Sequence, residues 1–253
     1  MSLLIDNPLC RPFWIDGSRE HGILLIHGFT ATPGTMNPLG RALAEKTGYT
    51  VAAPLLPGHG RTPEDMAKTR WHDWLRGAQH AFDKLSRQCK DVSVVGLSMG
   101  GALTLLLAET RPVRRAVPIA AALSVYNEKI IFANALWPVW RFFTEPEKEH
   151  EVMPDFLYEY NDTYDKTPVH CLADLNRLMR LARQGLPRIH CPIMNVRAGK
   201  DRTIHPRSTG WIMTEVSSRK KVLLELPRSP HVCTLGPERE LLFEETAKFL
   251  MER

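Results

Sequence analysis

One serine lies in the local sequence context that nucleophilic catalysis requires. Val92-Ser93-Val94-Val95 is rich in β-branched residues, typical of a buried strand, and a helical pattern follows at 102–108. Between them lies Gly96-Leu97-Ser98-Met99-Gly100, a G-x-S-x-G turn. Such a turn strains the serine backbone, and it is tolerated because the glycines have no side chain where strand and helix nearly touch. The alternative is an incidental serine in a glycine-rich loop.

A serine hydroxyl is a weak nucleophile at neutral pH, so it needs a general base and an acid that orients the base. His231 lies in the loop after the strand predicted at 222–226, and Asp201 lies just after the strand predicted at 192–197. The carboxyl ends of parallel strands meet at one edge of a sheet, so Ser98, Asp201 and His231 can converge there. Their order along the chain is also the one expected for this architecture.

Other histidines and acids compete for these roles. His205 is close to Asp201 in sequence and is the main alternative base, although one strand-end loop seldom supplies both acid and base. His59 lies between two glycines and is more typical of a shaped loop, whereas His27 is expected to form hydrogen bonds within its own loop. Asp91 begins the nucleophile strand, which places it at the wrong end of the sheet.

Acyl transfer also needs hydrogen-bond donors where negative charge develops on the carbonyl oxygen. The backbone N–H of Met99, at the start of the helix after the serine, is one predicted donor. The loop after the strand at 22–26 should supply the second donor, and Phe29 is the best-placed amide because Gly28 lets the backbone approach closely. We therefore expect Phe29 and Met99 to form the oxyanion hole.

Strand and helix patterns alternate along most of the chain. Apolar runs predict strands at 13–15, 22–26, 49–53, 92–95, 116–120, 192–197 and 222–226. Helical spacing predicts helices at 36–46, 71–85, 102–108 and 238–250. This alternation predicts an α/β fold with a mostly parallel sheet and helices on both faces.

Residues 122–187 interrupt the alternation. The segment has several prolines, no convincing strand, and helical patterns near 127–143 and 172–181. An insertion between two strands of a parallel sheet emerges at the edge where ligands bind, so we interpret it as a small helical cap over the Ser98 pocket. A peripheral helical layer with no part in binding is the alternative interpretation.

The predicted domain organisation follows from this interruption. Residues 1–121 and 188–253 form one catalytic domain, and residues 122–187 form the cap or lid. The cap contains a cluster of large side chains that is too apolar to face water as one patch. We expect some of them to pack on the domain and the others to line an acyl pocket. The cluster comprises Leu136, Trp137, Trp140, Phe142 and Phe143.

Length and composition are typical of one large globular domain. The chain has 253 residues, of which 43% are hydrophobic and 24% charged, and its formal net charge is +5. The basic residues are scattered rather than arranged in a stripe, which argues against nucleic-acid binding. No stretch approaches the length of a membrane span, and the first residues lack the pattern of a signal peptide. We therefore expect no integral membrane association.

The cysteines indicate a reducing compartment. Five cysteines are dispersed along the chain and never occur as C-x-x-C, which is typical of reduced thiols in a cytoplasmic protein. The repeated pairs His170-Cys171 and His190-Cys191 raise the alternative of a metal site, but neither has zinc-ligand spacing. We expect neither a metal nor a cofactor. The sequence leaves the oligomeric state open.

Five motifs, spread from near the start to near the end of the chain, carry a family resemblance. They are His27-Gly28-Phe29-Thr30, Pro57-Gly58-His59-Gly60, Gly96-Leu97-Ser98-Met99-Gly100-Gly101, Gly199-Lys200-Asp201-Arg202-Thr203-Ile204 and Ser229-Pro230-His231-Val232. With them the chain resembles the α/β-hydrolase family, and within it the small bacterial carboxylesterases and monoacylglycerol lipases. The resemblance covers essentially the whole catalytic domain, whereas the cap segment matches no family pattern.

The resemblance implies the α/β-hydrolase fold and a set of site residues. It implies Ser98 as nucleophile, His231 as base and Asp201 as orienting acid. It also implies the amides of Phe29 and Met99 as the oxyanion hole.

Three functions agree with this resemblance. The first is a serine carboxylesterase that hydrolyses small or monoacyl esters with an apolar acyl chain through an acyl-enzyme, without metal or cofactor. The second is a monoacylglycerol lipase, in which the cap also accepts a glycerol head. The third is a non-catalytic, hydrolase-like protein that binds a small ligand. Serine at position 98 argues against the dehalogenases and epoxide hydrolases of this fold, which use aspartate.

Overall fold

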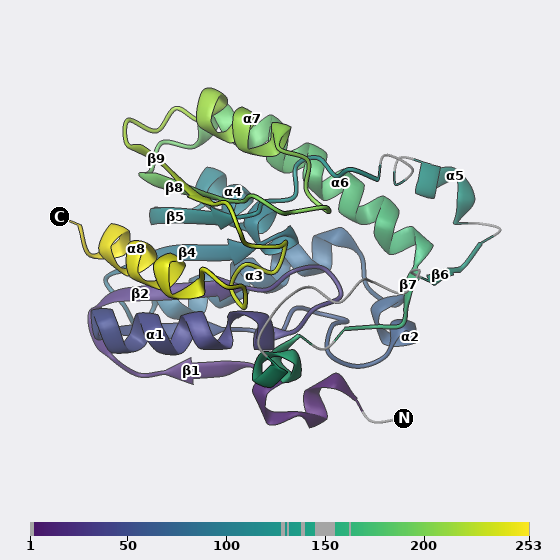
Figure 1. Cartoon of the computed structure of the whole chain (residues 1–253), viewed down its shortest axis with the longest axis horizontal. Helices are drawn as coiled ribbons and strands as arrows, with labels where there is room; N and C mark the ends of the chain where they lie inside the picture. The colour runs from purple at the N-terminus through teal and green to yellow at the C-terminus, as the bar shows by residue number, and fades with distance from the viewer. Residues whose placement is uncertain are drawn as a thin grey trace.

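The computed structural model describes residues 3–127, 130, 132–137, 140–144, 155–161 and 163–252. In this part of the chain the main sheet has seven strands in the order β1-β3-β2-β4-β5-β8-β9 (Figure 1). They are β1 Phe13–Ile15, β2 Ser18–Ile26, β3 Tyr49–Ala53, β4 Asp91–Leu97, β5 Val113–Ile119, β8 Ile193–Ala198 and β9 Lys221–Leu226. Only the β1–β3 pair in this sheet is antiparallel. The predicted α/β fold with a mostly parallel sheet is confirmed.

The central strands are buried on both faces, which explains their continuous apolar sequences. In β2, Leu24 and Ile26 belong to one hydrophobic core, while Ile23 and Leu25 belong to a second core on the opposite face. All four side chains are inaccessible to solvent. Because side chains alternate along a strand, a run of large aliphatic residues fills both cores at once.

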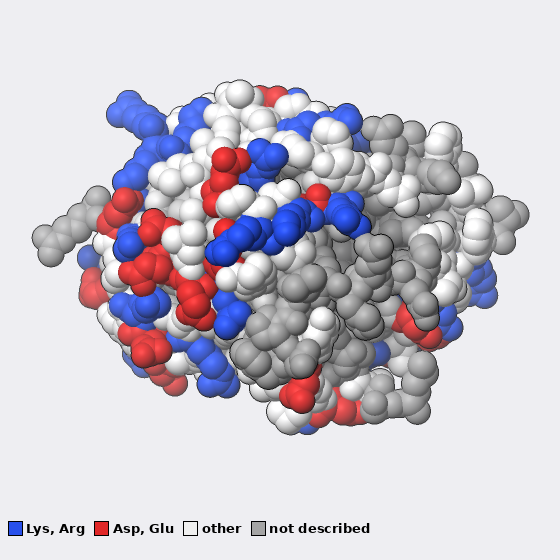
Figure 2. All heavy atoms as spheres, viewed as in Figure 1, with Lys and Arg blue, Asp and Glu red and all other residues white. Residues whose placement is uncertain are grey.

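Helices cover both faces of the sheet. One core packs against α1 Asn37–Thr47 and α8 Arg239–Met251, and the other against α3 Trp71–Ser86, α4 Met99–Thr110, α6 Val169–Gly185 and α7 Arg207–Glu215. Acidic and basic side chains are interspersed over α1 and α8 (Figure 2). Lys46 of α1 donates a 2.8 Å hydrogen bond to Glu244 of α8, which links the two helices at the surface.

The segment between β5 and β8 contains two short strands, so the expectation of no strand there was wrong. β6 Phe142–Thr144 pairs antiparallel with β7 Lys166–Pro168. The predicted helix at 127–143 is also wrong at its end, because Phe142 and Phe143 lie in β6; of the described residues there, α5 Ala133–Leu136 is α-helical. Aromatic residues and threonine favour strands, and β6 gains its hydrogen bonds only from a partner more than 20 residues away. The predicted boundaries at 122 and 187 remain predictions.

The apolar cluster of this segment does not pack as one unit. Leu136, Trp137 and Trp140 are 41%, 47% and 53% exposed. The expectation that the cluster is kept from water is therefore wrong for these three residues, whereas Phe143 packs against a small core that contains Ala133 and Val169. The acyl pocket remains a prediction. The single helical turn of α5 buries Ala133 against α6, and a helix of one turn has only one face to bury, so Leu136 is left exposed.

Candidate active site

Ser98 lies at a sharp turn between β4 and α4. Its backbone adopts φ 59° and ψ −116°, a strained conformation for a residue with a side chain. A Cβ on Gly100 would lie 2.1 Å from the carbonyl oxygen of Ile26, and a Cβ on Gly96 would lie 2.1 Å from the carbonyl oxygen of Gly100. Both positions therefore exclude any side chain. The close approach of α4 to the ends of two strands presents Ser98 at the carboxyl edge of the sheet.

Three predicted site residues form one hydrogen-bonded chain. Ser98 Oγ lies 3.0 Å from His231 Nε2, and His231 Nδ1 lies 2.7 Å from Asp201 Oδ2. The side chains of His231 and Asp201 are only 13% and 6% exposed. A carboxylate accepts hydrogen bonds, so Nδ1 of neutral His231 carries the ring proton. Nε2 is then the acceptor that faces the serine hydroxyl.

The Asp201 carboxylate is held by its own loop. Its Oδ1 accepts hydrogen bonds from the backbone N–H groups of Thr203 at 2.7 Å and Ile204 at 2.8 Å. Its Oδ2 is thereby directed toward His231. The Lys200 N–H also donates to the carbonyl of Ser229 at 3.0 Å, which ties the acid loop to the loop that carries the histidine.

Glu238 anchors the histidine loop, and the sequence analysis missed this residue. Its carboxylate accepts hydrogen bonds from the Ser229 hydroxyl at 2.8 Å and the Arg228 N–H at 2.9 Å. Burial alone would raise the pKa of Glu238, but these hydrogen bonds outweigh it and lower the pKa below its usual value. A glutamate just before a helix gives no local sequence signal for this role, because its partners are nine and ten residues away.

The loop that carries Phe29 lies directly against the serine. A Cβ on Gly28 would lie 3.4 Å from Ser98 Cβ, an ordinary van der Waals distance, so this backbone lies next to the serine side chain. Met99 begins α4, where the first N–H groups have no acceptor within the helix. Thr30 adopts φ 60°, and its hydroxyl lies 2.6 Å from the Phe29 carbonyl. The two predicted amides therefore lie on the backbone that flanks Ser98.

His27 ties this loop to the loop after β3. The Leu56 N–H donates to His27 Nε2 at 3.1 Å, so the ring proton is on Nδ1, which donates to the Gly28 carbonyl at 2.9 Å. Burial, followed by the neighbouring His59, lowers the His27 pKa to about 3. The expectation of a structural histidine with hydrogen bonds in its own loop agrees with these contacts.

His59 is a second buried, neutral histidine behind the same loop. Its Nδ1 donates to the Pro57 carbonyl at 3.0 Å, and burial lowers its pKa to about 4. Its Nε2 has no hydrogen-bond partner among the described residues. Its ring packs edge-on against Phe29 and Trp74, with ring centroids 6.4 Å and 5.8 Å away. These ring contacts hold the Phe29 side chain.

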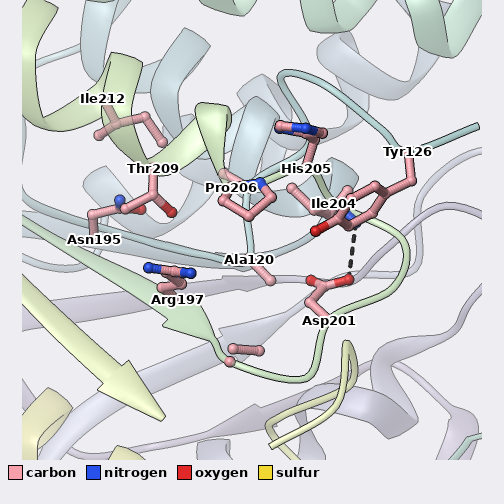
Figure 3. Close-up of a pocket in the computed structure, with 13 residues that line it drawn as sticks. Ala120, Tyr126, Asn195, Arg197, Asp201, Ile204, His205, Pro206, Thr209 and Ile212 are labelled. Atoms are coloured by element: carbon pink, nitrogen blue, oxygen red, sulfur yellow. Dashed lines mark hydrogen bonds between the residues drawn. The ribbon is translucent and has the colours of Figure 1, made fainter. Parts of the chain in front are cut away.

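The alternative base is turned away from the triad. His205 Nδ1 accepts hydrogen bonds from the N–H and Nε–H of Arg207, both at 3.1 Å, and its ring lies 4.9 Å from that of Tyr126. His205, Tyr126 and Asp201 line a cavity of about 80 Å³. Figure 3 shows the side chains around it. The competing acid, Asp91, pairs with His21 at the opposite end of the sheet.

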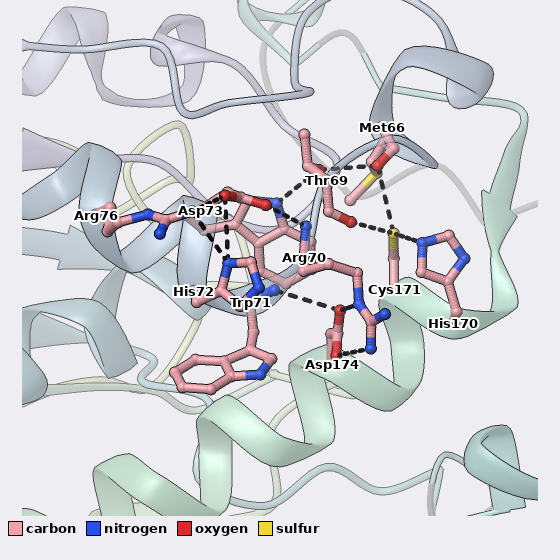
Figure 4. A network of polar contacts seen from close by, with 11 residues as sticks. Met66, Thr69, Arg70, Trp71, His72, Asp73, Arg76, His170, Cys171 and Asp174 are labelled. Carbon is pink, nitrogen blue, oxygen red and sulfur yellow. Dashed lines mark hydrogen bonds and ion pairs between the residues drawn. The ribbon is translucent and has the colours of Figure 1, made fainter.

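A polar network around the buried Asp174 side chain fastens α6 to the start of α3, as shown in Figure 4. Asp174 accepts hydrogen bonds from Arg70 Nε at 2.5 Å, Arg70 Nη2 at 3.2 Å and the Trp71 N–H at 3.3 Å. The neighbouring Cys171 thiol lies 3.6 Å from the Met66 carbonyl, and burial raises its pKa to about 12. The described part of the chain contains no cluster of three or more His, Cys, Asp or Glu side chains suited to a metal ion.

The fold and this geometry define the class of the protein. The chain belongs to the alpha/beta hydrolase family, whose model matches residues 23–243. The resemblance inferred from the motifs is thereby confirmed. Within the described ranges, no helix combines the length and the apolar character needed to cross a bilayer.

Individual relatives agree along nearly the whole chain. A thermostable monoacylglycerol lipase of Bacillus sp. (strain H-257) is 36% identical over 94% of this chain and 93% of its own length. A carboxylesterase of Bacillus subtilis (strain 168) is 31% identical over 95% of this chain and 96% of its own. A solved structure from work on LipS and LipT, two metagenome-derived lipolytic enzymes, superimposes with a TM-score of 0.88 at 31% identity and covers 97% of this chain and 99% of that one.

The ion pair between the buried Asp174 of α6 and Arg70, the residue before α3, should contribute to stability. Asp174→Asn leaves the volume unchanged but removes the negative charge that Arg70 and the Trp71 amide bind, so the free energy of unfolding should fall by about 1–3 kcal/mol. The matched control is Glu64→Gln, which breaks the exposed Glu64–Lys166 pair between α2 Pro63–Met66 and β7. It should cost clearly less than Asp174→Asn, because solvent screens this pair. Urea unfolding measures both, and equal losses would contradict the argument.

The buried histidines should make the protein less stable in acid. In the unfolded chain His27 and His59 bind protons below a pKa of 6.5, whereas in the folded protein their pKa values are about 3 and about 4. Unfolding therefore takes up protons between these values, and the free energy of unfolding should fall by about 1.4 kcal/mol per pH unit for each histidine as the pH drops below 6. Urea unfolding between pH 6 and pH 4 measures this slope.

A variant separates this effect from the titration of carboxylates. His59→Gln removes one of the two buried rings, so the slope should decrease by about one proton. The exposed His80→Gln is the matched control and should leave the slope unchanged. An unchanged slope in His59→Gln would refute the proposed origin of the acid sensitivity.

Proposed function

We propose that this chain is a serine carboxylesterase that hydrolyses small or monoacyl esters with an apolar acyl chain. The observation that carries the proposal is the continuous Ser98–His231–Asp201 chain of hydrogen bonds, with distances of 3.0 Å and 2.7 Å. The triad members come from three separate loops at one edge of the sheet. The relatives at 36% and 31% identity, a monoacylglycerol lipase and a carboxylesterase, support ester hydrolysis as the reaction class.

In this proposal the reaction begins at Ser98. As its Oγ attacks the ester carbonyl, His231 Nε2 takes the hydroxyl proton, and Asp201 stabilises the resulting imidazolium through Nδ1. His231 then gives the proton to the leaving alcohol, and an acyl-Ser98 ester remains. Water, deprotonated by the same histidine, then attacks the acyl carbon. The bond from this carbon to Ser98 Oγ breaks, His231 returns the proton to Oγ, and the carboxylic acid leaves. Each proton moves through one ring nitrogen, so the reaction depends on the orientation of His231.

The tetrahedral intermediates carry an oxyanion, and we assign its stabilisation to the backbone N–H groups of Phe29 and Met99. The contact of Gly28 with Ser98 and the free first turn of α4 support this assignment. The hydrogen bond from His27 Nδ1–H to the Gly28 carbonyl is also consistent with it, because it fixes that carbonyl next to the proposed donor.

We assign residues 122–187 to a cap that selects the substrate. Contacts with the loops around the site support this role: the Thr163 hydroxyl lies 3.1 Å from the Thr30 hydroxyl, and the Tyr164 hydroxyl donates to the Gly58 carbonyl at 2.9 Å. Burial raises the Tyr164 pKa to about 12, so this hydroxyl remains a donor. The proposed cap therefore contacts the loop that carries Phe29, through Thr163 and Thr30.

Variants of the triad test the reaction. Ser98→Ala should reduce kcat for p-nitrophenyl butyrate by about 10⁶-fold, and His231→Ala should be similarly damaging because the two residues act as a unit. Asp201→Asn should cost roughly 10⁴-fold, because the amide favours the wrong imidazole tautomer. His205→Ala is the matched control and should lose far less activity. If His205→Ala lost more activity than His231→Ala, the assignment of His231 as the base would be wrong.

A fluorophosphonate probe distinguishes the enzyme from a hydrolase-like binding protein. The wild-type protein should be labelled at Ser98 and should turn over the ester, whereas Ser98→Ala should do neither. A folded wild-type protein that is neither labelled nor active would favour the binding protein.

Ester series test the substrate class. Each methylene buried in an acyl pocket contributes about 0.8 kcal/mol, so kcat/KM for p-nitrophenyl esters should rise about fourfold per CH₂ until the pocket is full. A monoacylglycerol of the optimal length should then be compared with the ethyl ester of the same acid. A clear preference for the monoacylglycerol would favour the lipase, as the 36% identical relative suggests. A preference for emulsified long-chain triacylglycerol would contradict both assignments.

A further inference from the structure

The strand β9 ends the main sheet and has a free edge. Figure 1 shows it at the rim of the sheet, and it pairs with β8 alone. The carbonyls of Lys220 and Leu226 accept hydrogen bonds from the β8 side, at 3.0 Å from the Ile193 N–H and 2.8 Å from the Gly199 N–H. Backbone groups alternate along a strand in a parallel ladder, so the even-numbered residues of β9 face β8. The N–H and C=O groups of residues 221, 223 and 225 therefore point outward.

The same three residues present their side chains to solvent. Lys221, Leu223 and Glu225 alternate with more buried residues along β9, and Leu223 is 41% exposed. Among the described residues, their backbone groups have no partner beyond the sheet edge. Figure 2 shows basic side chains gathered over the turn that leads into this strand. The exposed side chains along this edge are therefore a cation (Lys221), an apolar residue (Leu223) and an anion (Glu225).

We infer that β9 pairs with β9 of a second copy of this chain, antiparallel and across a two-fold axis at Leu223. In this register Lys221 lies opposite Glu225 of the second copy, Leu223 lies opposite its own counterpart, and Glu225 lies opposite Lys221. The residues that pair are those whose backbone groups point outward, so each pair exchanges two hydrogen bonds. The sheet then continues through both copies and two opposite-charge pairs form.

The charges select this register and this partner. A shift of two residues brings Leu223 opposite Lys221 or Glu225 and loses both Lys221–Glu225 pairs, which are equivalent by symmetry. The other edge of the sheet, β1, has only three residues, and its pairing with β9 would build an open filament rather than a closed dimer. Charged residues usually protect an edge strand against any partner. Here the spacing of one Lys and one Glu around a central Leu is complementary to itself.

Existing contacts leave these charges available. Lys221 Nζ donates to the Met213 carbonyl at 3.0 Å and thus keeps further N–H donors for a carboxylate. Glu225 accepts one hydrogen bond from Arg197 at 3.0 Å through Oε1. Pairing of two six-residue strands buries less surface than a permanent dimer, so the dimer should be weak and should depend on protein concentration.

Sedimentation velocity of the full chain, from low to high micromolar concentration, tests the inference. The wild-type protein should shift from monomer to dimer. Lys221→Glu and Glu225→Lys each place like charges opposite one another in both symmetric pairs, so each should raise the dissociation constant about tenfold or more. The double variant Lys221→Glu/Glu225→Lys restores opposite charges and should recover dimerisation.

Two further measurements keep the test independent of folding and of the proposed enzymatic function. Circular dichroism of each variant should match that of the wild-type protein, and turnover of p-nitrophenyl butyrate by the monomer should be unchanged, since none of these side chains belongs to the site. A monomer at every concentration would overturn the inference. So would a dimer that both single reversals leave intact, or a double variant that dissociates as readily as the single variants.

Discussion

The site depends on a steric constraint, the contact between the first turn of α4 and the ends of β2 and β4. Gly100 touches the Ile26 carbonyl so closely that a single added carbon would overlap it. This approach sets the direction in which α4 leaves the sheet and requires the positive φ of Ser98. The serine is thus held by backbone packing rather than by its own side chain. Because backbone packing fixes the position of Ser98, the serine hydroxyl is not needed to hold the turn and can form a hydrogen bond with His231.

The remaining site residues are held by hydrogen bonds between loops. Each loop at this edge is fastened to a neighbour: His27 joins its loop to Leu56, Lys200 joins the acid loop to the histidine loop, and Glu238 fastens the latter to the start of α8. Loops are usually the most mobile parts of a domain, yet nucleophilic catalysis requires side chains whose positions vary by well below an ångström. Hydrogen bonds between neighbouring loops restrict their motion and so hold the side chains of the site in place.

Much of the fold could be predicted because its signals are local. Residues 49–53 form a strand at the predicted bounds, and 71–85 form a helix that ends one residue later. The order of Ser98, Asp201 and His231 relative to the strands was sufficient to nominate side chains that the structure brings together. By contrast, β6 and β7 are three residues each and form only through mutual pairing. Asp174 and Arg70 are 104 residues apart, so no local pattern could have joined them.

His27 and His59 form hydrogen bonds with the backbone near Phe29 while both rings remain uncharged. Protonation of either ring would place a positive charge in a fully buried position among other rings, and would require Nδ1 and Nε2 both to donate. For His27 that would break the hydrogen bond from Leu56, because Nε2 could no longer accept it. Burial thus keeps the ring neutral, and neutrality preserves the hydrogen bond that positions the loop. The free-energy cost of protonating buried His27 therefore has two effects. It preserves the hydrogen bond that positions the loop of Phe29, and it makes the fold sensitive to acid.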